Sequence, residues 1–191
     1  MRLYHVSHKE IKKPDINIGR KNADLGRGFY TSDSKEFTLM WALPQNGIQP
    51  VINIYELDES GLKIIKLSRD RKWLDCIVKN RTGQGDVYAD CDVTSGPIAN
   101  DTLFETLGIT TSSILSVDQL LDVMKIGPEY YQTVIKTEKA AKQLTFVKSV
   151  ALSEEITARY SYLRKRLEED FSNQFNKTLA SILAPDEPDN N

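Results

Sequence analysis

The sequence predicts an α+β fold, in which short strands and helices alternate irregularly along 191 residues. A run rich in β-branched residues at 51–57 is typical of a strand. Apolar residues spaced by three and four positions at 34–42, and again at 156–183, are typical of helices with one buried face. A chain of this length can bury a core without disulfides. These features indicate one α+β domain followed by a helical extension.

Composition excludes several classes of protein. The chain has 25 basic and 27 acidic side chains, so its net charge of −2 provides no overall attraction to nucleic acid or to an anionic membrane. Its two cysteines, Cys76 and Cys91, form no CxxC pair, and neither a zinc site nor a disulfide scaffold is indicated. The N-terminus lacks the apolar run of a secretory signal, and no apolar stretch is long enough to span a membrane. We therefore expect a soluble, cytoplasmic protein without a metal.

The first predicted elements surround a glycine turn. Alternation at 3–7 predicts a strand, and a polar loop follows it. Gly26 and Gly28 permit a tight backbone turn directly before an aromatic pair. Asp33, with Glu36 three positions later, predicts the N-terminus of the next helix.

Local patterns predict the order of the later elements. These are a helix at 34–42, strands at 51–57 and 62–67, a helix at 73–81, a strand at 87–93, a helix at 116–125, an extended segment at 129–136, a short helix at 138–143 and a strand at 145–151. The strands at 51–57 and 62–67 are expected to form an antiparallel pair, because only a short turn separates them. Ser116, with Gln119 three positions later, predicts a capping box, and Thr137 predicts the cap of the short helix.

The C-terminal stripe at 156–183 is long for a domain of this size. As one helix of ~30 residues it would extend ~45 Å. We therefore expect it to break near 170–173 into a hairpin, or to offer its apolar stripe to a partner. The predicted parts of the chain are a domain at 1–151, an amphipathic helix or helical hairpin at 152–184 and a disordered tail at 185–191.

Three blocks of sequence carry a resemblance to a known superfamily. The blocks at 3–7 (LYHVS), 26–30 (GRGFY) and 132–136 (QTVIK) resemble the ADP-ribosyltransferases of the diphtheria-toxin and poly(ADP-ribose)-polymerase type, whose cleft is marked by His, Tyr and Glu in that order. Within that superfamily the chain is similar to a bacterial family of unknown function, DUF3990. The blocks that carry this closer likeness are 73–75 (WLD), 80–81 (NR), 96–101 (GPIAND) and 136–140 (KTEKA).

The resemblance implies a split, mostly antiparallel β-sheet core with peripheral helices, whose cleft binds NAD in a bent shape. His5 would hydrogen-bond the adenine-side ribose, the backbone of Val6 would hold the nicotinamide carboxamide, and Tyr30 would stack on the nicotinamide ring. Thr38 falls where the superfamily has a serine for the carboxamide, and Trp41 where it has a second stacking aromatic residue. The implied NAD-binding residues are His5, Val6, Ser7, Gly28, Tyr30, Thr38 and Trp41, and the implied catalytic residues are His5, Tyr30 and Gln132.

Gln132 departs from the pattern, because the superfamily has a glutamate at this position. An amide can hydrogen-bond the ribose 2′-hydroxyl but has no negative charge and cannot act as a base. The difference is compatible with a slower transferase, with an acceptor that needs no base, or with a cleft that binds NAD without cleaving it. Glu129 is an alternative carboxylate, and Asp101, Asn80 and Arg81 are further candidates to supply charge or to orient a substrate.

The resemblance favours an NAD-dependent mono-ADP-ribosyltransferase that needs no metal and transfers ADP-ribose to a protein, nucleic-acid or small-molecule acceptor. Hydrolysis of NAD is a related activity. By analogy with other members of the superfamily, the protein would be the toxin of a bacterial toxin–antitoxin system. Its partner through 153–183 would be an antitoxin or a second copy of the chain. The alternative is a catalytically silent module that binds NAD or ADP-ribose. A third reading, NAD-dependent removal of a 2′-phosphate from RNA, is less favoured, because its basic residues are not found in this sequence.

Overall fold

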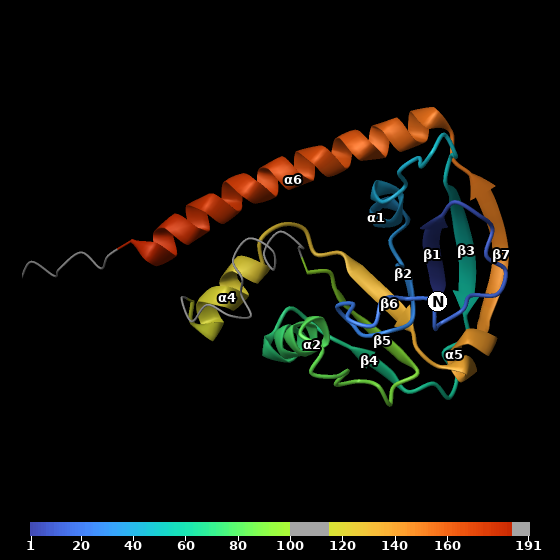
Figure 1. Ribbon diagram of the computed structural model, residues 1–191, viewed down its shortest axis with the longest axis horizontal. Coiled ribbons are helices and arrows are strands. Elements are labelled where there is room, and N and C mark those ends of the chain that lie inside the picture. The colour runs from blue at the N-terminus through green and yellow to red at the C-terminus, as the bar shows by residue number, and fades with distance from the viewer. Residues whose placement is uncertain (100–114, 185–191) are drawn as a thin grey trace, which may run out of the picture.

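The computed structural model describes residues 1–99 and 115–184, which form two small β-sheets and five helices (Figure 1). The strands are β1 (Arg2–Ser7), β2 (Phe29–Thr31), β3 (Val51–Leu57), β4 (Ile64–Lys66), β5 (Val93–Pro97), β6 (Tyr131–Ile135) and β7 (Leu144–Ala151). The helices are α1 (Lys35–Met40), α2 (Arg71–Arg81), α4 (Val117–Met124), α5 (Glu138–Lys142) and α6 (Glu154–Leu183). The predicted mixed α+β class is therefore confirmed.

The pairing of the strands differs from the prediction. The first sheet has the order β1-β3-β7 and is antiparallel, whereas the second has the order β2-β6-β5-β4 and contains one parallel pair, β4 with β5. The predicted antiparallel pair of 51–57 and 62–67 is wrong, because these strands belong to different sheets. Just before β4, the Lys63 N–H donates to Asp92 Oδ2 at 2.8 Å, and the Asp92 N–H donates to Lys63 O at 2.9 Å. These bonds draw β4 to β5 and away from β3.

The strand predicted at 87–93 begins only at Val93. Asp86 is the reason, because it folds the residues after it into a turn. The Tyr88 N–H donates to Asp86 Oδ1 at 3.0 Å, and the Ala89 N–H donates to the Asp86 carbonyl at 3.2 Å. Local side-chain bonds of this kind compete with strand formation.

Two apolar cores flank the second sheet. One lies between the sheets and includes Leu3, Phe29, Tyr55, Val93 and Ile135. The other lies on the opposite face of the second sheet and includes Leu25, Trp73, Val134, Phe171 and Phe175. Trp73 of α2 is fully buried, and its indole N–H donates to the Pro97 carbonyl at 2.8 Å. Residues of β2 and β6 therefore contribute to both cores through their alternating side chains.

The helix α6 runs unbroken from Glu154 to Leu183, so the break predicted near 170–173 is wrong. It passes over α1 and reaches α4 at its other end (Figure 1). Thr157 is buried near the first end, and Phe171 and Phe175 are buried in the core beside α2 and α4. Packing at both ends stabilises this helix, because tertiary contacts supply most of the stability of helices in proteins.

Parts of the prediction lie outside the described residues: the tail at 185–191, and Asn100 and Asp101 of the block at 96–101. Among the helices that are described, none is both long and apolar enough to cross a bilayer.

Candidate functional site

The two sheets meet where β1 crosses the end of β2. The Tyr4 N–H donates to the Ser32 carbonyl at 2.8 Å, and the Ser32 N–H donates to the Tyr4 carbonyl at 3.0 Å. In an antiparallel pair the residue two positions away faces the same edge, so the backbone of Val6 faces Tyr30. No ladder bond forms there within the described residues. Instead, His5 Nδ1 lies 2.7 Å from the Tyr30 carbonyl oxygen.

The His5 imidazole therefore takes the place of a ladder bond and ends the pairing of β1 with β2. This leaves the N–H and the carbonyl of Val6 facing the split between the sheets, and neither has a partner from β2 in the described part of the chain. Backbone groups without a strand partner are available to bind a ligand. The split thus offers one donor and one acceptor side by side.

His5 is held neutral with a defined tautomer. Its ring lies against Phe29, with the ring centroids 4.5 Å apart, and burial lowers its pKa, although the bond to the Tyr30 carbonyl acts in the opposite direction. A carbonyl can only accept, so Nδ1 carries the proton and Nε2 has a free lone pair. In the described residues Nε2 has no protein partner. It can therefore accept a hydrogen bond from a ligand hydroxyl.

The lowered pKa of His5 predicts a pH-dependent stability. The ordinary pKa is 6.5, so the unfolded chain binds more protons than the folded protein as the pH falls through this value. The free energy of unfolding should fall on acidification below pH 6.5 and be fully present above it. His5→Gln keeps a donor for the Tyr30 carbonyl but does not titrate. Urea unfolding at about pH 7.5 and about pH 5.5 should show a smaller fall for the variant than for the wild type, and an equal fall would contradict the assignment.

Tyr30 uses its hydroxyl to hold the glycine turn. The hydroxyl donates to the Gly26 carbonyl at 2.7 Å and accepts from the Leu25 N–H at 3.0 Å. Burial raises the pKa of the phenol well above its ordinary value, so it does not exchange a proton at neutral pH. Gly26 has φ +87°, and a Cβ there would lie 2.0 Å from Asp86 Oδ2. Tyr30, Gly26 and Asp86 thus form one packed unit.

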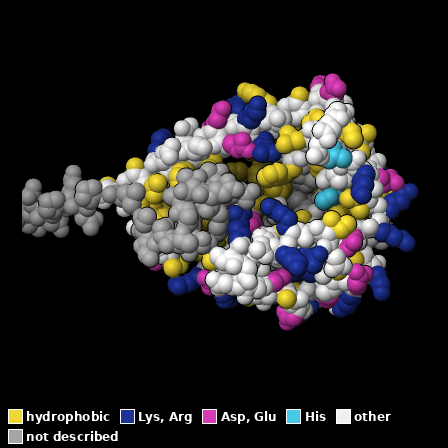
Figure 2. Space-filling model, in the orientation of Figure 1, with side chains coloured by type: hydrophobic (Ala, Val, Ile, Leu, Met, Phe, Trp, Pro, Cys, Tyr) yellow, Lys and Arg dark blue, Asp and Glu magenta, His cyan; other side chains and the backbone are white. Residues whose placement is uncertain are grey.

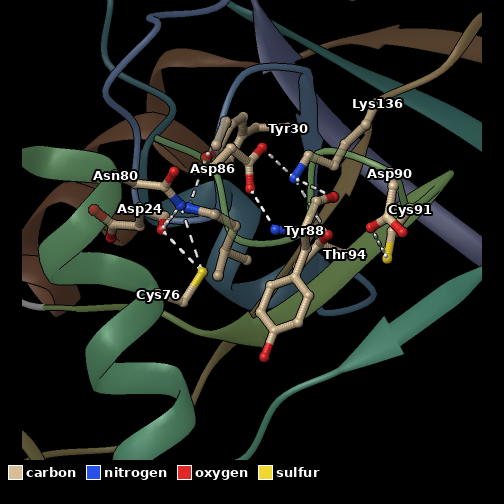
Figure 3. Close-up of polar contacts among 12 residues, drawn as sticks. Asp24, Tyr30, Cys76, Asn80, Asp86, Tyr88, Asp90, Cys91, Thr94 and Lys136 are labelled. Atoms are coloured by element: carbon tan, nitrogen blue, oxygen red, sulfur yellow. Dashed lines mark hydrogen bonds and ion pairs between the residues drawn. The ribbon is translucent and has the colours of Figure 1, made fainter. Parts of the chain in front are cut away.

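A buried polar cluster lies beneath this turn (Figure 3). Lys136 Nζ pairs with Asp86 Oδ2 at 2.5 Å, and the Lys136 side chain is only 4% exposed. Arg81 Nε pairs with Asp24 Oδ1 at 2.6 Å, and the Asn80 amide donates to the Asp24 carbonyl at 3.0 Å. Asn80 and Arg81, which were candidates to orient a substrate, therefore anchor the loop that leads into the turn.

Cys76 belongs to the same cluster but is not a nucleophile. It lies on α2 within hydrogen-bond distance of Asn80 and the Asp24 carbonyl. Burial raises the pKa of its thiol to about 11, with a further contribution from the Asp86 carboxylate. Because only the thiolate attacks, this cysteine is inert at neutral pH.

The helix α1 packs against β1 and contains Thr38, and Trp41 is its C-cap. Its N-cap is Ser34, whose hydroxyl accepts the Phe37 N–H at 3.1 Å, so the N-terminus predicted at Asp33 is one residue too early. Thr38 is buried and its hydroxyl donates to the Ser34 carbonyl at 2.8 Å, which leaves the oxygen free to accept. Trp41 follows the helix and is 48% exposed.

Gln132 shares a face of the second sheet with Tyr30. In the register of β2 and β6, Tyr30 lies opposite Val134, so Gln132 is its diagonal neighbour on that face. Gln132 is half-buried. The alternative carboxylate, Glu129, is exposed and accepts a hydrogen bond from the Tyr131 hydroxyl at 2.5 Å. Because side chains alternate along β6, Tyr131 points to the opposite face from Gln132. Glu129, which bonds the Tyr131 hydroxyl, is therefore held away from the face of Gln132.

Two predicted NAD-binding residues, Ser7 and Gly28, also have structural roles. The Ser7 hydroxyl donates to the Lys9 carbonyl at 2.5 Å and accepts from the Asn53 amide at 3.0 Å, which fixes the end of β1. A Cβ on Gly28 would lie 2.5 Å from the Ile135 carbonyl oxygen. Gly28 is therefore required for the close approach of the turn to β6.

The structure thus brings His5, Val6 and Tyr30 to one junction, but the His5 ring lies against Phe29, whereas the Tyr30 ring packs on the opposite face of the second sheet. His5 reaches Tyr30 through the Tyr30 carbonyl, and Gln132 lies on the same sheet face as the Tyr30 ring. No hydrogen bond or ring contact connects the three side chains in the part of the chain that is described. Figure 2 shows a hollow beneath α6 lined by hydrophobic side chains, on the face that also carries histidine.

Sequence reasoning missed a contact between α6 and the end of α1. The Arg164 guanidinium of α6 lies 4.6 Å from the centroid of the Trp41 ring. The spacing of Arg164 and Glu168 predicts a helical ion pair, but no local signal shows that this turn of α6 crosses the end of α1.

Comparison with known proteins identifies the family. A family model described as a protein of unknown function (DUF3990) matches residues 1–146. The chain belongs to the DUF3990 family. The match covers the elements from β1 into β7, and so includes the β1–β2 junction, the glycine turn and Gln132. The helix α6 lies beyond the part matched to DUF3990. No curated protein matches the chain.

Proposed function

We propose that this DUF3990 protein is an NAD-dependent mono-ADP-ribosyltransferase built on an ADP-ribosyltransferase-like split sheet. The proposal rests on the His5 wedge, by which we mean the imidazole that bonds the Tyr30 carbonyl in place of a ladder bond. This contact leaves the Val6 N–H and carbonyl facing the split between the sheets. The resemblance in sequence assigns NAD-binding roles to these same three residues.

The groups at the junction complement the nicotinamide end of NAD. A carboxamide has one acceptor oxygen and an NH₂ donor, so it can bind both backbone groups of Val6 at once. The Thr38 oxygen, whose proton is used within α1, can accept the second carboxamide N–H. The Nε2 lone pair of His5 can accept a hydroxyl of the adenine-side ribose. The site therefore offers a partner for each polar group of the nicotinamide carboxamide.

The reaction breaks the bond between nicotinamide N1 and ribose C1′. The electron pair leaves with neutral nicotinamide, and the ribose develops oxocarbenium character in the transition state. An acceptor nucleophile then forms a bond to C1′ and loses its proton to the solvent or to a base on the acceptor. The protein contributes positioning and electrostatic stabilisation. The Gln132 amide can hydrogen-bond the 2′-hydroxyl, but it cannot stabilise positive charge as a carboxylate does.

Gln132 also supports a second candidate function. A cleft with an amide in place of the carboxylate retains its ligand contacts and loses the charge that lowers the barrier to cleavage. The chain would then bind NAD or ADP-ribose without turnover, and its partner would be recruited by the bound state.

Labelled NAD separates these functions. The pure protein is incubated with NAD carrying labels on the adenine and nicotinamide moieties, alone and with bacterial lysate. Transfer of adenine label to a macromolecule with release of nicotinamide supports the transferase. Release of nicotinamide without transfer indicates a hydrolase, and saturable binding without release indicates the silent module. Absence of binding at millimolar NAD would contradict the proposal.

Replacement of Gln132 by glutamate is expected to raise the rate of nicotinamide release at least about tenfold, because it restores a negative charge beside the developing cation. Single-turnover release of nicotinamide measures the effect. Gln174→Glu, at an exposed position on α6, adds the same charge away from the sheet and should leave the rate unchanged. Equal rates for the two variants would count against the place assigned to Gln132.

A further inference from the structure

In the middle of α6, the Arg164 side chain places its positive charge over the ring of Trp41. The Arg164 guanidinium lies 4.6 Å from the centroid of the Trp41 ring, and its Nε donates to Glu168 Oε1 at 2.7 Å. The contact is held from both sides, because α6 is anchored on α1 near one end and in the core beside α4 near the other. Trp41 nevertheless keeps almost half of its surface exposed.

The ring of Trp41 attracts positive charge. An indole face binds a cation through its quadrupole, and it binds planar, delocalised cations such as guanidinium well because they can stack. The nicotinamide ring of NAD⁺ is also a planar cation with delocalised charge. The dihydronicotinamide ring of NADH is neutral, and ADP-ribose has no ring at this position. Among these ligands, only NAD⁺ has a planar ring with delocalised positive charge, which resembles the guanidinium that Arg164 already places on the Trp41 ring.

We propose that Arg164 is a resident competitor for the Trp41 face, and that the pyridinium ring of NAD⁺ must displace it in order to bind. The inference rests on the proposed function, since it assigns the displaced position to the nicotinamide ring. In this arrangement α6 inhibits the site, because its Arg164 occupies the ring face that the nicotinamide needs. It also makes the site selective for the oxidised cofactor, because a neutral ring gains nothing from displacing a cation.

The test compares two ligands that differ only in the nicotinamide ring. Dissociation constants for NAD⁺ and ADP-ribose are measured by calorimetry for the full chain and for Arg164→Gln. Removal of the competitor should tighten NAD⁺ binding by about 2-fold to about 30-fold, the range set by the strength of a cation–π contact. ADP-ribose binding should not tighten. The ratio of the two constants cancels any general effect of the lost charge on a diphosphate ligand.

Two further variants control the test. Arg166→Gln removes an exposed cation two positions along α6 and should leave the ratio unchanged. In a Trp41→Leu background, Arg164→Gln should no longer change the ratio, because the shared face is gone. An unchanged ratio for Arg164→Gln, or equal tightening of both ligands, would overturn the inference while leaving the proposed function intact. If the wild type bound neither ligand, the proposed function itself would fail, and the inference would fail with it.

Discussion

Lys136→Met is expected to lower the free energy of unfolding by about 3 to 5 kcal/mol, because it leaves the Asp86 carboxylate without its partner in a mostly buried position. The Lys136 side chain is 4% exposed and the Asp86 side chain 19% exposed. Methionine matches the shape of the lysine stem, so the effect measures the lost charge rather than a cavity. Urea unfolding followed by circular dichroism gives the difference.

A matched control exists three residues away. Lys139 also pairs with an aspartate, Asp92, at 3.4 Å, but its side chain is 55% exposed. Lys139→Met should therefore cost at most about 1 kcal/mol. The double variant Lys136→Met with Asp86→Leu removes both buried charges and should recover most of the lost stability. Similar losses for the two single lysine variants would show that the buried pair does not hold the glycine turn.

His5→Ala is expected to reduce kcat/KM for nicotinamide release by about 100-fold, which corresponds to about 2.7 kcal/mol of transition-state stabilisation. Two effects combine. Under the proposed function, the variant loses the Nε2 acceptor for a hydroxyl of the adenine-side ribose, and it also removes the His5 wedge from the β1–β2 junction. The Tyr30 carbonyl then becomes available to the Val6 N–H, so the strands can pair and close the split.

The second histidine provides the control for this experiment. His8 is exposed and its Nε2 lies 3.0 Å from the Leu43 carbonyl, outside the junction. His8→Ala should keep kcat/KM within about twofold of the wild type, whereas His5→Gln, which retains an N–H for Tyr30, should lose less than His5→Ala. Hydrogen exchange at the Val6 amide gives an independent readout, because closure of the split should slow it. A His5→Ala protein as active as His8→Ala would refute the assigned role of the wedge.

Features of this chain that depend on neighbouring residues were predicted best. The strand at 51–57 has the predicted bounds, and the capping box of Ser116 with Gln119 is present with both of its hydrogen bonds. Thr137 caps α5 as expected, with its side chain accepting the Ala140 N–H. Each of these features depends on residues a few positions apart, whose preferences persist in any fold.

The wrong strand pairing and the missed continuity of α6 concern partners that are distant in the sequence, whereas the errors at 87–93 and at Asp33 concern local side-chain bonds. The segment at 62–67 pairs with β5 rather than β3, because Lys63 and Asp92 hydrogen-bond each other. The helix α6 continues past 170–173, because Phe171 and Phe175 pack into the core beside α4. Hydrophobic periodicity shows which face of an element will be buried, but not which neighbour will cover it.

The sequence by itself determined most of the segments that are strands or helices and the caps of α4 and α5, and it showed that the order of His5, Tyr30 and Gln132 resembles that of an NAD-binding superfamily. Only the tertiary structure decided that the His5 ring replaces a ladder bond, that Asp86 and Lys136 support the glycine turn, and that Arg164 covers Trp41. The physical reason is that capping and periodicity are satisfied within a few residues, whereas these contacts exist only after two sheets and a long helix have packed together.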